Sequence, residues 1–402
     1  GYDGKLHRFY AKQGRKLTEH VLVFQQIIDT PNMLSNSPSG RSATLVNGQY
    51  APVIDMQPGD VQLWRMINAN VSNIVPISFT RLLGGTAPAA AATPSPAPSS
   101  APSSGFTYKQ TAQDGVQLGW DNYNASTNTN PAVALDPANR VDLLVQAPAT
   151  PGTYVVMDGP PHKKNIPIFY VRVAGNSVSL TQPFPATRGD YPRMPSFLRD
   201  LDSKNVLVRR EIDYGWLGNL TQPGQIPDGF PQFTINGRQF QDRTIDEVML
   251  LGSKEEWTVL NSTTGIPHPF HIHINPFQIF EVFAPAFDPT GKTPPNYLPF
   301  VVPQPFVWWD TFGIPPGVVL PKIDPSTGKP LVDPKTGAPP IDPRTGKPAV
   351  LGEILPGYFK MRSRFVDFTG LYVQHCHILT HEDRGMMQLL EVVSNKTILK
   401  HH

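Results

Sequence analysis

Cysteine is almost absent from this chain, because Cys376 is the only one among 402 residues. No intramolecular disulfide can form, so the single thiol is available for chemistry or for burial. An excess of charge is missing as well: 34 Lys and Arg stand against 32 Asp and Glu, which gives a formal net charge of +2. This balance, together with the lack of a clustered basic run, excludes a protein that binds nucleic acid by electrostatic attraction.

Long apolar runs are also missing. No stretch of about eighteen apolar residues occurs, so we expect no transmembrane segment. Residues 1–10 lack the charged-then-apolar profile of a signal peptide, which leaves open a cytoplasmic, an already processed or a truncated chain. Hydrophobic residues nevertheless make up 39% of the sequence and charged residues 16%, a composition that can bury packed cores.

Proline is the residue in excess, with 45 in the chain, about twice its usual share. Because proline interrupts helices, we predict an all-β protein with proline-rich turns. An Ala/Pro/Ser-rich stretch at about 86–105 predicts a surface loop. A second insertion, at about 321–352, repeats Asp-Pro-x-Thr-Gly every nine residues from Asp324. Proline presets the second position of a turn and glycine accepts a left-handed one, so each unit predicts a turn, in either a partner-binding loop or a plain surface insertion.

A longer internal repeat divides the chain in two. In each half a glycine is followed by a tryptophan five residues later and an asparagine four residues after that: Gly59, Trp64 and Asn68, then Gly252, Trp257 and Asn261. The flanking segments alternate apolar and polar residues as strands do. One type of β-domain used twice is therefore expected, over 1–190 and 191–402.

The histidines of the second half gather in two short windows. Six of the eleven histidines of the chain lie there, in His268-Pro-Phe-His271-Ile-His273 and in His375-Cys376-His377-Ile-Leu-Thr-His381. Strand side chains alternate, so His375 and His377 are expected on one face and Cys376 on the other. An ungapped comparison puts no histidine at the matching places of the first half, so only the second half is expected to carry a site.

The donor types point to a metal. Cys376, His381 and Met386 follow one another at intervals of five residues, and His268 can add a second imidazole. Two histidines and one cysteine in a plane, with a weak axial methionine, form the blue-copper arrangement. The alternative is a zinc site or a histidine-rich core, but zinc prefers a closed tetrahedron and needs no cysteine flanked by histidines that face away.

These two windows resemble the copper-binding signatures of the multicopper oxidases, in particular bacterial laccases and cuprous oxidases. Trp309-Asp310-Thr311 and Arg364-Phe365-x-Asp367 are also similar to that family. The resemblance implies two tandem cupredoxin-like Greek-key β-sandwich or barrel domains, the first copper-free, corresponding to the middle and C-terminal domains of the family. It implies type 1 copper at His268, Cys376, His381 and Met386, type 2 at His271, and type 3 at His273, His375 and His377.

The resemblance also implies the activity and what this chain lacks. Such enzymes oxidise phenols or other reducing substrates at type 1 and pass electrons along the Cys-His backbone to a trinuclear cluster that reduces dioxygen to water. Half of that cluster's imidazoles come from two His-x-His motifs in an N-terminal domain, whereas the remaining histidines here are His7, His20, His162, His401 and His402. We expect a missing domain of roughly 100–150 residues as partner. The alternative is a type 1 copper electron-transfer protein without oxidase activity. A secreted or periplasmic location is favoured by the resemblance alone.

Neighbouring side chains receive further roles. Glu382 is similar to the carboxylate that relays protons near the cluster in the family. Asp310 and Asp383 are expected to fix the tautomer of a ligand imidazole, since metal-bound histidine usually donates its other N–H to an oxygen. Met387 could compete with Met386, but in an extended segment neighbours point to opposite faces.

Overall fold

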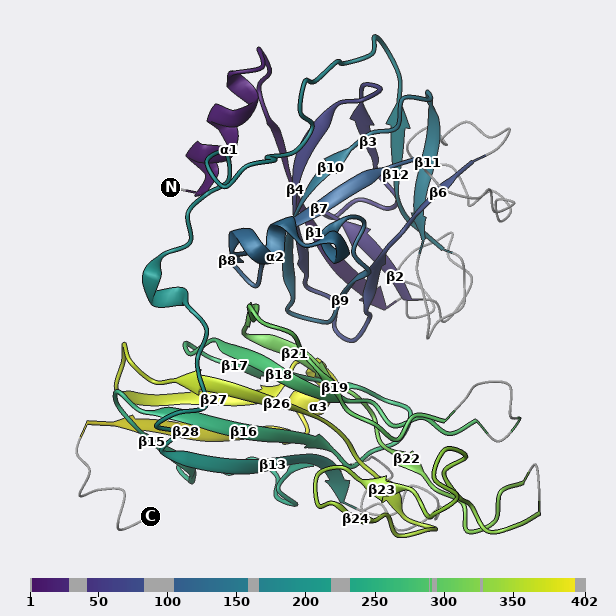
Figure 1. The fold of residues 1–402 in the computed structure, drawn as a ribbon, viewed down its shortest axis with the longest axis vertical. Coiled ribbons are helices and arrows are strands. Elements are labelled where there is room, and N and C mark those ends of the chain that lie inside the picture. Colours follow the sequence, from purple (N-terminus) through teal and green to yellow (C-terminus); the bar gives the residue numbers. More distant parts are fainter. Residues whose placement is uncertain are drawn as a thin grey trace. The chain divides into compact units, whose positions relative to one another are not determined.

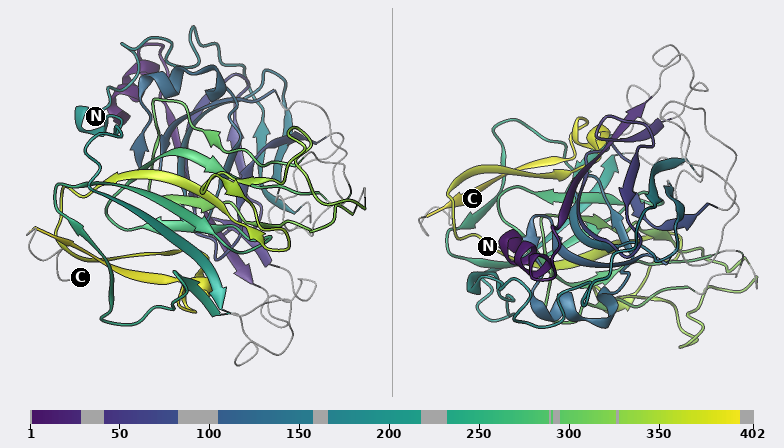
Figure 2. Two further views of the ribbon diagram at one scale, coloured as in Figure 1. Left: turned by 60° about the horizontal axis from the view of Figure 1, so that its bottom comes forward. Right: turned by 90° about the horizontal axis from the view of Figure 1, so that it is seen from above.

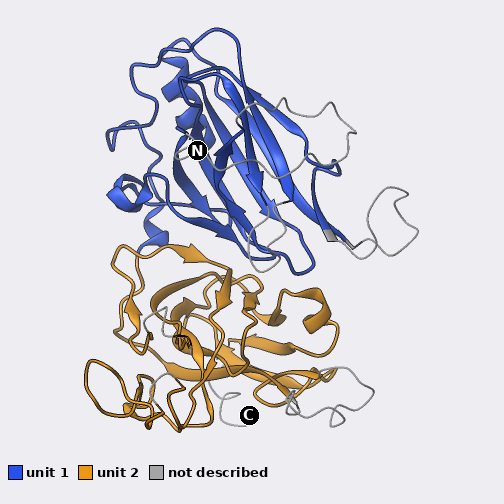
Figure 3. Ribbon diagram, turned by 90° about the vertical axis from the view of Figure 1, so that its right-hand side faces the viewer, with its two compact units in different colours: residues 1–199 blue, residues 200–402 orange. Residues whose placement is uncertain are grey.

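The computed structural model describes residues 2–28, 42–82, 105–157, 166–217, 232–288, 290, 295–325 and 328–394. Most of the loop expected at 86–105 lies outside them, as do His162, His401 and His402. The chain divides into two compact units, unit 1 (Gly1–Arg199) and unit 2 (Asp200–His402), as Figure 3 shows. The division falls slightly after the boundary expected at residue 190.

Unit 1 contains two mixed sheets. The first has the order β2 (Ser42–Val46), β1 (Thr18–Ile28), β4 (Val61–Asn68), β10 (Arg140–Gln146), β7 (Thr107–Gln113) and β8 (Val116–Gln117). The second has the order β3 (Val53–Met56), β12 (Pro167–Val173), β11 (Gly152–Met157) and β6 (Phe79–Arg81). A short pair joins β5 (Val75–Ile77) to β9 (Val133–Leu135). Alternate apolar side chains of both sheets meet in one core that includes Phe24, Trp64 and Phe169.

Unit 2 repeats this design, and its strands can be followed in Figures 1 and 2. Its first sheet runs β14 (Gln232–Ile235), β13 (Val208–Leu217), β16 (Lys254–Asn261), β26 (Gly357–Arg364), β18 (Phe277–Phe283) and β19 (Phe300–Val301), with β20 (Trp308–Trp309) also paired to β18. Its second sheet runs β15 (Ile245–Leu250), β28 (Met387–Val393), β27 (Gly370–Cys376), β17 (His268–Ile272) and β21 (Thr311–Ile314). In both units one strand pair of each sheet is parallel, β1 with β4 and β3 with β12, then β13 with β16 and β15 with β28.

The repeated tryptophan of unit 2 belongs to a buried ionic network. Trp257 donates its indole N–H to Glu255 Oε2 at 2.8 Å. Arg210 donates two hydrogen bonds to the same carboxylate, from Nε to Oε2 at 2.8 Å and from Nη2 to Oε1 at 3.1 Å. It also forms an ion pair with Glu247. Only 1% of the Glu255 side chain is exposed. The ion pair with Arg210 therefore offsets the free-energy cost of burying its charge.

In unit 1 the equivalent tryptophan has an uncharged hydrogen-bond partner. Trp64 donates its indole N–H to the amide oxygen of Gln62 at 3.1 Å. In the strand register His20 lies opposite Trp64 as Arg210 lies opposite Trp257. The internal repeat seen in the sequence thus corresponds to equivalent strands in equivalent register.

Helices are few and short in the part of the chain that the structure describes. They are α1 (Tyr2–Ala11), α2 (Trp120–Asn124), α3 (Leu379–Glu382) and two 3₁₀ turns, Ser126–Asn128 and Ser196–Leu198. Helix α1 was not expected from the sequence; it buries Leu6, Phe9 and Tyr10 in a small cluster of unit 1. Within the described ranges, no helix is both long enough and apolar enough to cross a membrane.

The nine-residue repeat forms a chain of turns. Its base is closed by β22 (Val318–Val319) paired with β25 (Ile354–Leu355), and its last unit contains β23 (Ile341–Asp342) paired with β24 (Lys347–Pro348). In every unit the glycine N–H bonds the aspartate carbonyl oxygen at 2.8 Å, and the glycine φ is 68° or 69°. Each unit therefore closes its own backbone hydrogen bonds with glycine in the left-handed position, as the sequence predicted.

Candidate metal centre

Two paired strands carry most of the candidate donors. Strands β17 and β27 are antiparallel, with His271 opposite His375 and Phe270 opposite Cys376. Directly paired residues share a face of the sheet, so His271 and His375 lie on one face. Phe270 and Cys376 lie on the other, inside the apolar core of unit 2. One sheet thus separates two groups of donors.

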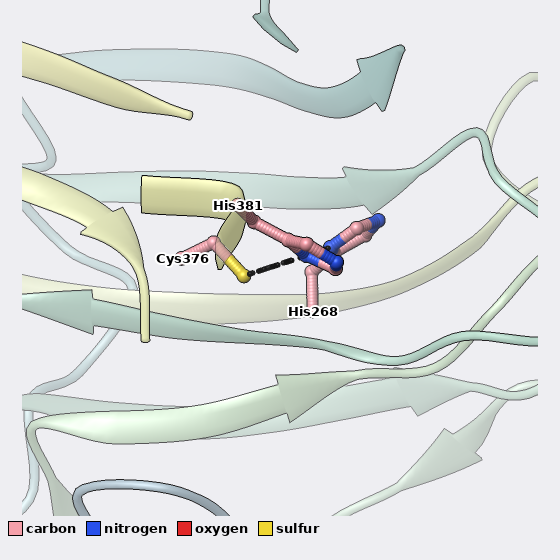
Figure 4. A group of neighbouring side chains, drawn as sticks. All are labelled: His268, Cys376 and His381. Atoms are coloured by element: carbon pink, nitrogen blue, oxygen red, sulfur yellow. Dashed lines mark hydrogen bonds between the residues drawn. The ribbon is translucent and has the colours of Figure 1, made fainter. Parts of the chain in front are cut away.

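The first group, here the Cys376 group, consists of His268, Cys376 and His381 with Met386 beside them. The Nδ1 atoms of His268 and His381 are 3.1 Å apart, and they lie 3.6 and 3.5 Å from Cys376 Sγ. Figure 4 shows the three side chains pointing toward one another. The centre of the triangle of donor atoms lies about 2.0 Å from each of them. This is close to the distances at which a metal ion such as zinc binds imidazole nitrogen, about 2.0–2.1 Å, and thiolate sulfur, about 2.3 Å.

The loop after β27 brings His381 and Met386 back to Cys376. The Met386 N–H bonds the His381 carbonyl oxygen, and the Cys376 N–H bonds the Met386 carbonyl oxygen, both at 3.0 Å. Met386 is fully buried in the same core as Cys376. Met387 instead pairs with His375 in the register of β27 and β28, which places it on the opposite face. This geometry supports Met386 as the axial candidate.

The tautomer of His268 follows from its hydrogen bonds. The Asn261 amide nitrogen donates to the carbonyl oxygens of Ile266 and Ile314, which turns its amide oxygen toward Thr263. The Thr263 hydroxyl donates to that oxygen at 2.6 Å and must therefore accept from His268 Nε2, 3.0 Å away. The lone pair of His268 Nδ1 is then free to face the thiol, as a metal ligand requires.

Burial keeps the imidazoles of the Cys376 group neutral. It is the main reason that the pKa of His268 lies well below its usual range, with a smaller contribution from His381. Burial, and then the charge of Arg384, lower the pKa of His381 to about 4. Both rings are neutral at pH 7, so a cationic metal can bind without displacing protons from them.

The second group, here the four-histidine group, lies on the other face of the sheet. Ligand atoms of His271, His273 and His375 all lie within 4.8 Å of one another, with 3.3 Å between the Nε2 atoms of His273 and His375. The ring centroid of His377 is 5.3 Å from that of His375 and 5.5 Å from that of His271. Burial is also the main cause that lowers the pKa of His375, to about 3.

In two of these rings, those of His271 and His375, the Nδ1 atom lies within hydrogen-bond distance of oxygen atoms. His271 Nδ1 lies 2.9 Å from the Asp310 carbonyl oxygen, 2.8 Å from the Thr311 hydroxyl and 3.7 Å from Asp310 Oδ1. His375 Nδ1 lies 3.0 Å from Glu382 Oε2 and 3.2 Å from the Cys376 carbonyl oxygen. An Nδ1–H that donates to these oxygens leaves Nε2 of each ring as the metal ligand.

The expected roles of the acidic residues divide accordingly. Asp310 lies beside His271, where it can orient that ring. Glu382, expected as a proton relay, contacts the ring of His375, and burial followed by Asp383 raises the pKa of its carboxyl. Asp383 itself is exposed, and no described imidazole lies in hydrogen-bond contact with its side chain. The structure therefore does not bring Asp383 to a ligand ring.

Several residues of the site were not found from the sequence. Thr263 and Phe233 lie outside both histidine windows, yet Thr263 bonds one imidazole and Phe233 stacks on another. Asn261 had a signal, because the repeat pairs it with Asn68, whose amide nitrogen likewise bonds two carbonyl oxygens in unit 1. No comparable pattern marks Phe233. Of the remaining histidines, His7 and His20 lie in unit 1, where His7 contacts Glu19.

Comparisons with known proteins agree with this chemistry. A sequence profile of the family described as multicopper oxidase matches residues 218–320. A laccase of Bacillus subtilis is 24% identical over 358 residues, which cover 87% of this chain and 54% of that protein. The multicopper oxidase mco of Staphylococcus aureus is 27% identical over 164 residues, which cover 40% of this chain and 24% of that protein.

Solved structures show the same architecture. A multicopper oxidase from Campylobacter jejuni aligns with a TM-score of 0.56 at 19% identity, covering 94% of this chain and 64% of that one. A multicopper oxidase from Pediococcus acidilactici aligns with a TM-score of 0.58 at 18% identity, covering 97% and 62%. The prediction of an all-β, cupredoxin-like architecture is confirmed. The chain spans about half of the B. subtilis laccase and less than two thirds of these two structures.

Proposed function

We propose that this chain is a member of the multicopper oxidase family, which its matching profile and relatives support. Within that family it would be the part of a laccase-like oxidase that takes electrons from a reducing substrate. Copper is the metal that the family implies, bound as type 1 by His268, Cys376, His381 and Met386. His271 would hold type 2 copper, and His273, His375 and His377 would hold type 3. When bound, copper would supply one-electron transfer at the Cys376 group and the reduction of dioxygen at the four-histidine group.

One observation carries the proposal. Cys376 belongs to one donor group, and the residue before it, His375, belongs to the other. The two lie on opposite faces of one sheet and are joined by a single peptide bond. This backbone offers a short covalent route between the groups, and a simple electron carrier would have no use for the second group.

The donor set favours copper over the zinc alternative. Three donors of two kinds converge on one point, and the further candidate is the weak thioether of Met386. A trigonal set with a weak axial thioether is a copper arrangement, whereas structural zinc takes a closed tetrahedron of thiolates, imidazoles or carboxylates. The protein keeps the two rings neutral, holds the His268 tautomer through Thr263 and surrounds the thiolate with apolar side chains.

The four-histidine group supports a missing partner. Three copper ions held by four imidazoles would keep open positions, so we propose that a further domain supplies the remaining ligands to this group. The short span of the chain relative to its relatives agrees with this proposal. The substrate is proposed to be a phenol or a related reducing compound, because relatives are named laccases.

The isolated chain should accordingly bind copper without acting as an oxidase. We expect about one tightly held copper per chain and no sustained dioxygen uptake with a phenolic substrate, because affinity follows the number and geometry of ligands. Copper is counted by elemental analysis after dialysis, and uptake is followed with an oxygen electrode. About four retained coppers with sustained turnover would contradict the missing-partner proposal. Retained copper without visible absorption would contradict the proposal that the Cys376 group binds type 1 copper.

Met386 can be tested against its neighbour. Replacement of an axial thioether by a non-coordinating side chain alters the potential of such a site. We expect Met386→Leu to raise the reduction potential while copper stays bound, and the matched control Met387→Leu to leave it unaltered. Redox titration of the visible band measures both. A shift in Met387→Leu alone would transfer the axial role to Met387.

A further inference from the structure

Phe233 touches both imidazoles of the Cys376 group. Its ring stacks on His381, with the centroids 3.9 Å apart and an interplanar angle of 23°. The same ring meets His268 edge-on, at 6.4 Å and 71°. Phe233 is only 5% exposed. A single buried apolar side chain thus stacks on one donor ring and lies edge-on to the other.

Two kinds of contact fix the position of Phe233: packing against strand β13, and hydrogen bonds made by the segment that follows β14. Strand β14 pairs with β13, where Trp216 lies opposite Phe233 with its ring centroid 6.1 Å away. The segment after β14 is tied to the loop that bears the ligands. The Gln239 side-chain amide donates to the Arg384 carbonyl oxygen at 2.7 Å, and the Phe240 N–H donates to the Gly385 carbonyl oxygen at 2.9 Å.

This arrangement couples ring orientation to packing. His381 lies in the short helix α3 that follows β27, outside the strands of the sheet, so no strand backbone fixes the plane of its ring. The stacked contact selects one plane, and in that plane Nδ1 faces Cys376 Sγ at 3.5 Å. A smaller side chain at position 233 would free the ring and admit water beside it.

We propose that Phe233 is a positioning residue of the Cys376 group, which holds the His381 and His268 rings for copper and sets its reduction potential by excluding water. The inference rests on the proposed function, since it requires copper at this group. Water stabilises the more highly charged, oxidised state of a metal site, so opening the site lowers the potential. A stacked aromatic side chain of another kind should preserve the effect.

Three substitutions separate positioning from simple packing. Phe233→Ala should lower the reduction potential of the copper-loaded chain and alter the intensity of its visible band. Phe233→Tyr should restore both, and Phe233→Leu, which fills space without a ring face, should restore the potential more than the band. Phe365→Ala is the matched control, because the Phe365 ring is likewise buried in the core of unit 2 but packs on Trp257.

The outcomes are distinguishable. A potential and a band that both stay at the wild-type values in Phe233→Ala and Phe233→Leu would overturn the inference. Equal shifts in Phe365→Ala and Phe233→Ala would also overturn it, since they would reflect general loosening. If Phe233→Ala does not fold, Phe233→Leu against Phe233→Tyr still decides through the band. Failure of the wild-type chain to develop any visible band would instead refute the proposed copper function itself.

Discussion

We expect the Cys376→Ser variant to lose completely the intense visible absorption that the proposed type 1 site would give the copper-loaded chain. The absorption arises from charge transfer between copper and a thiolate, and Cys376 is the only thiol of the protein. Its sulfur lies 3.5 and 3.6 Å from the two imidazole nitrogens with which it would share the metal. Absorption spectra recorded at equal copper loading measure the effect.

The serine variant needs a test of integrity. Cys376 is fully buried, so its far-ultraviolet circular dichroism should first be shown to match that of the wild-type chain. Met387→Leu serves as the control, because Met387 lies on the other face of the sheet. An unchanged band in Cys376→Ser would refute the assignment of the type 1 ligands.

Arg210→Ala should destabilise unit 2 by about 3–5 kcal/mol, the usual cost of breaking a buried ion pair from one side. The substitution leaves Glu255 buried with a charge and only the Trp257 indole N–H as a neutral donor. Glu247 loses the same partner. Chemical denaturation followed by tryptophan fluorescence measures the free energy of unfolding.

Unit 1 supplies the matched control for this network. It keeps the tryptophan but has Gln62 and His20 where unit 2 has Glu255 and Arg210. The double variant Arg210→His with Glu255→Gln removes both charges and should recover most of the lost stability. A double variant as unstable as Arg210→Ala would show that side-chain packing, and not the unpaired charge, causes the loss.

Local sequence patterns predicted much of the fold. The spacing from Gly59 to Asn68 and from Gly252 to Asn261 identified equivalent strands, which the structure places in equivalent register. Strand alternation predicted that Cys376 and His375 face apart, as they do. These predictions succeeded because they depend on a period of two residues, which any strand obeys. Helix α1 escaped prediction because its apolar face is short and its burial depends on distant segments.

The environment of the donors depended on contacts that no local pattern records. Phe233 reaches His381 because β14 pairs with β13, a pairing between residues far from either histidine window. Thr263 reaches His268 through the turn that follows β16. Asp383 shows the opposite error, because a role beside a ligand imidazole was expected for it and the structure does not place it there. It follows Glu382 in sequence, but at the end of α3 its side chain is exposed to solvent. Ligand types can be recognised from spacing, whereas their supports require the tertiary structure.

The nine-residue units have a consequence for the length of the insertion. Each unit completes its own hydrogen bonds, from Asp324 to Gly328, from Asp333 to Gly337 and from Asp342 to Gly346, and the insertion is closed at its base by β22 and β25. No unit therefore depends on its neighbours for these hydrogen bonds. Addition or removal of one unit would change the length of the insertion by a complete turn and leave the hydrogen bonds inside the other units intact.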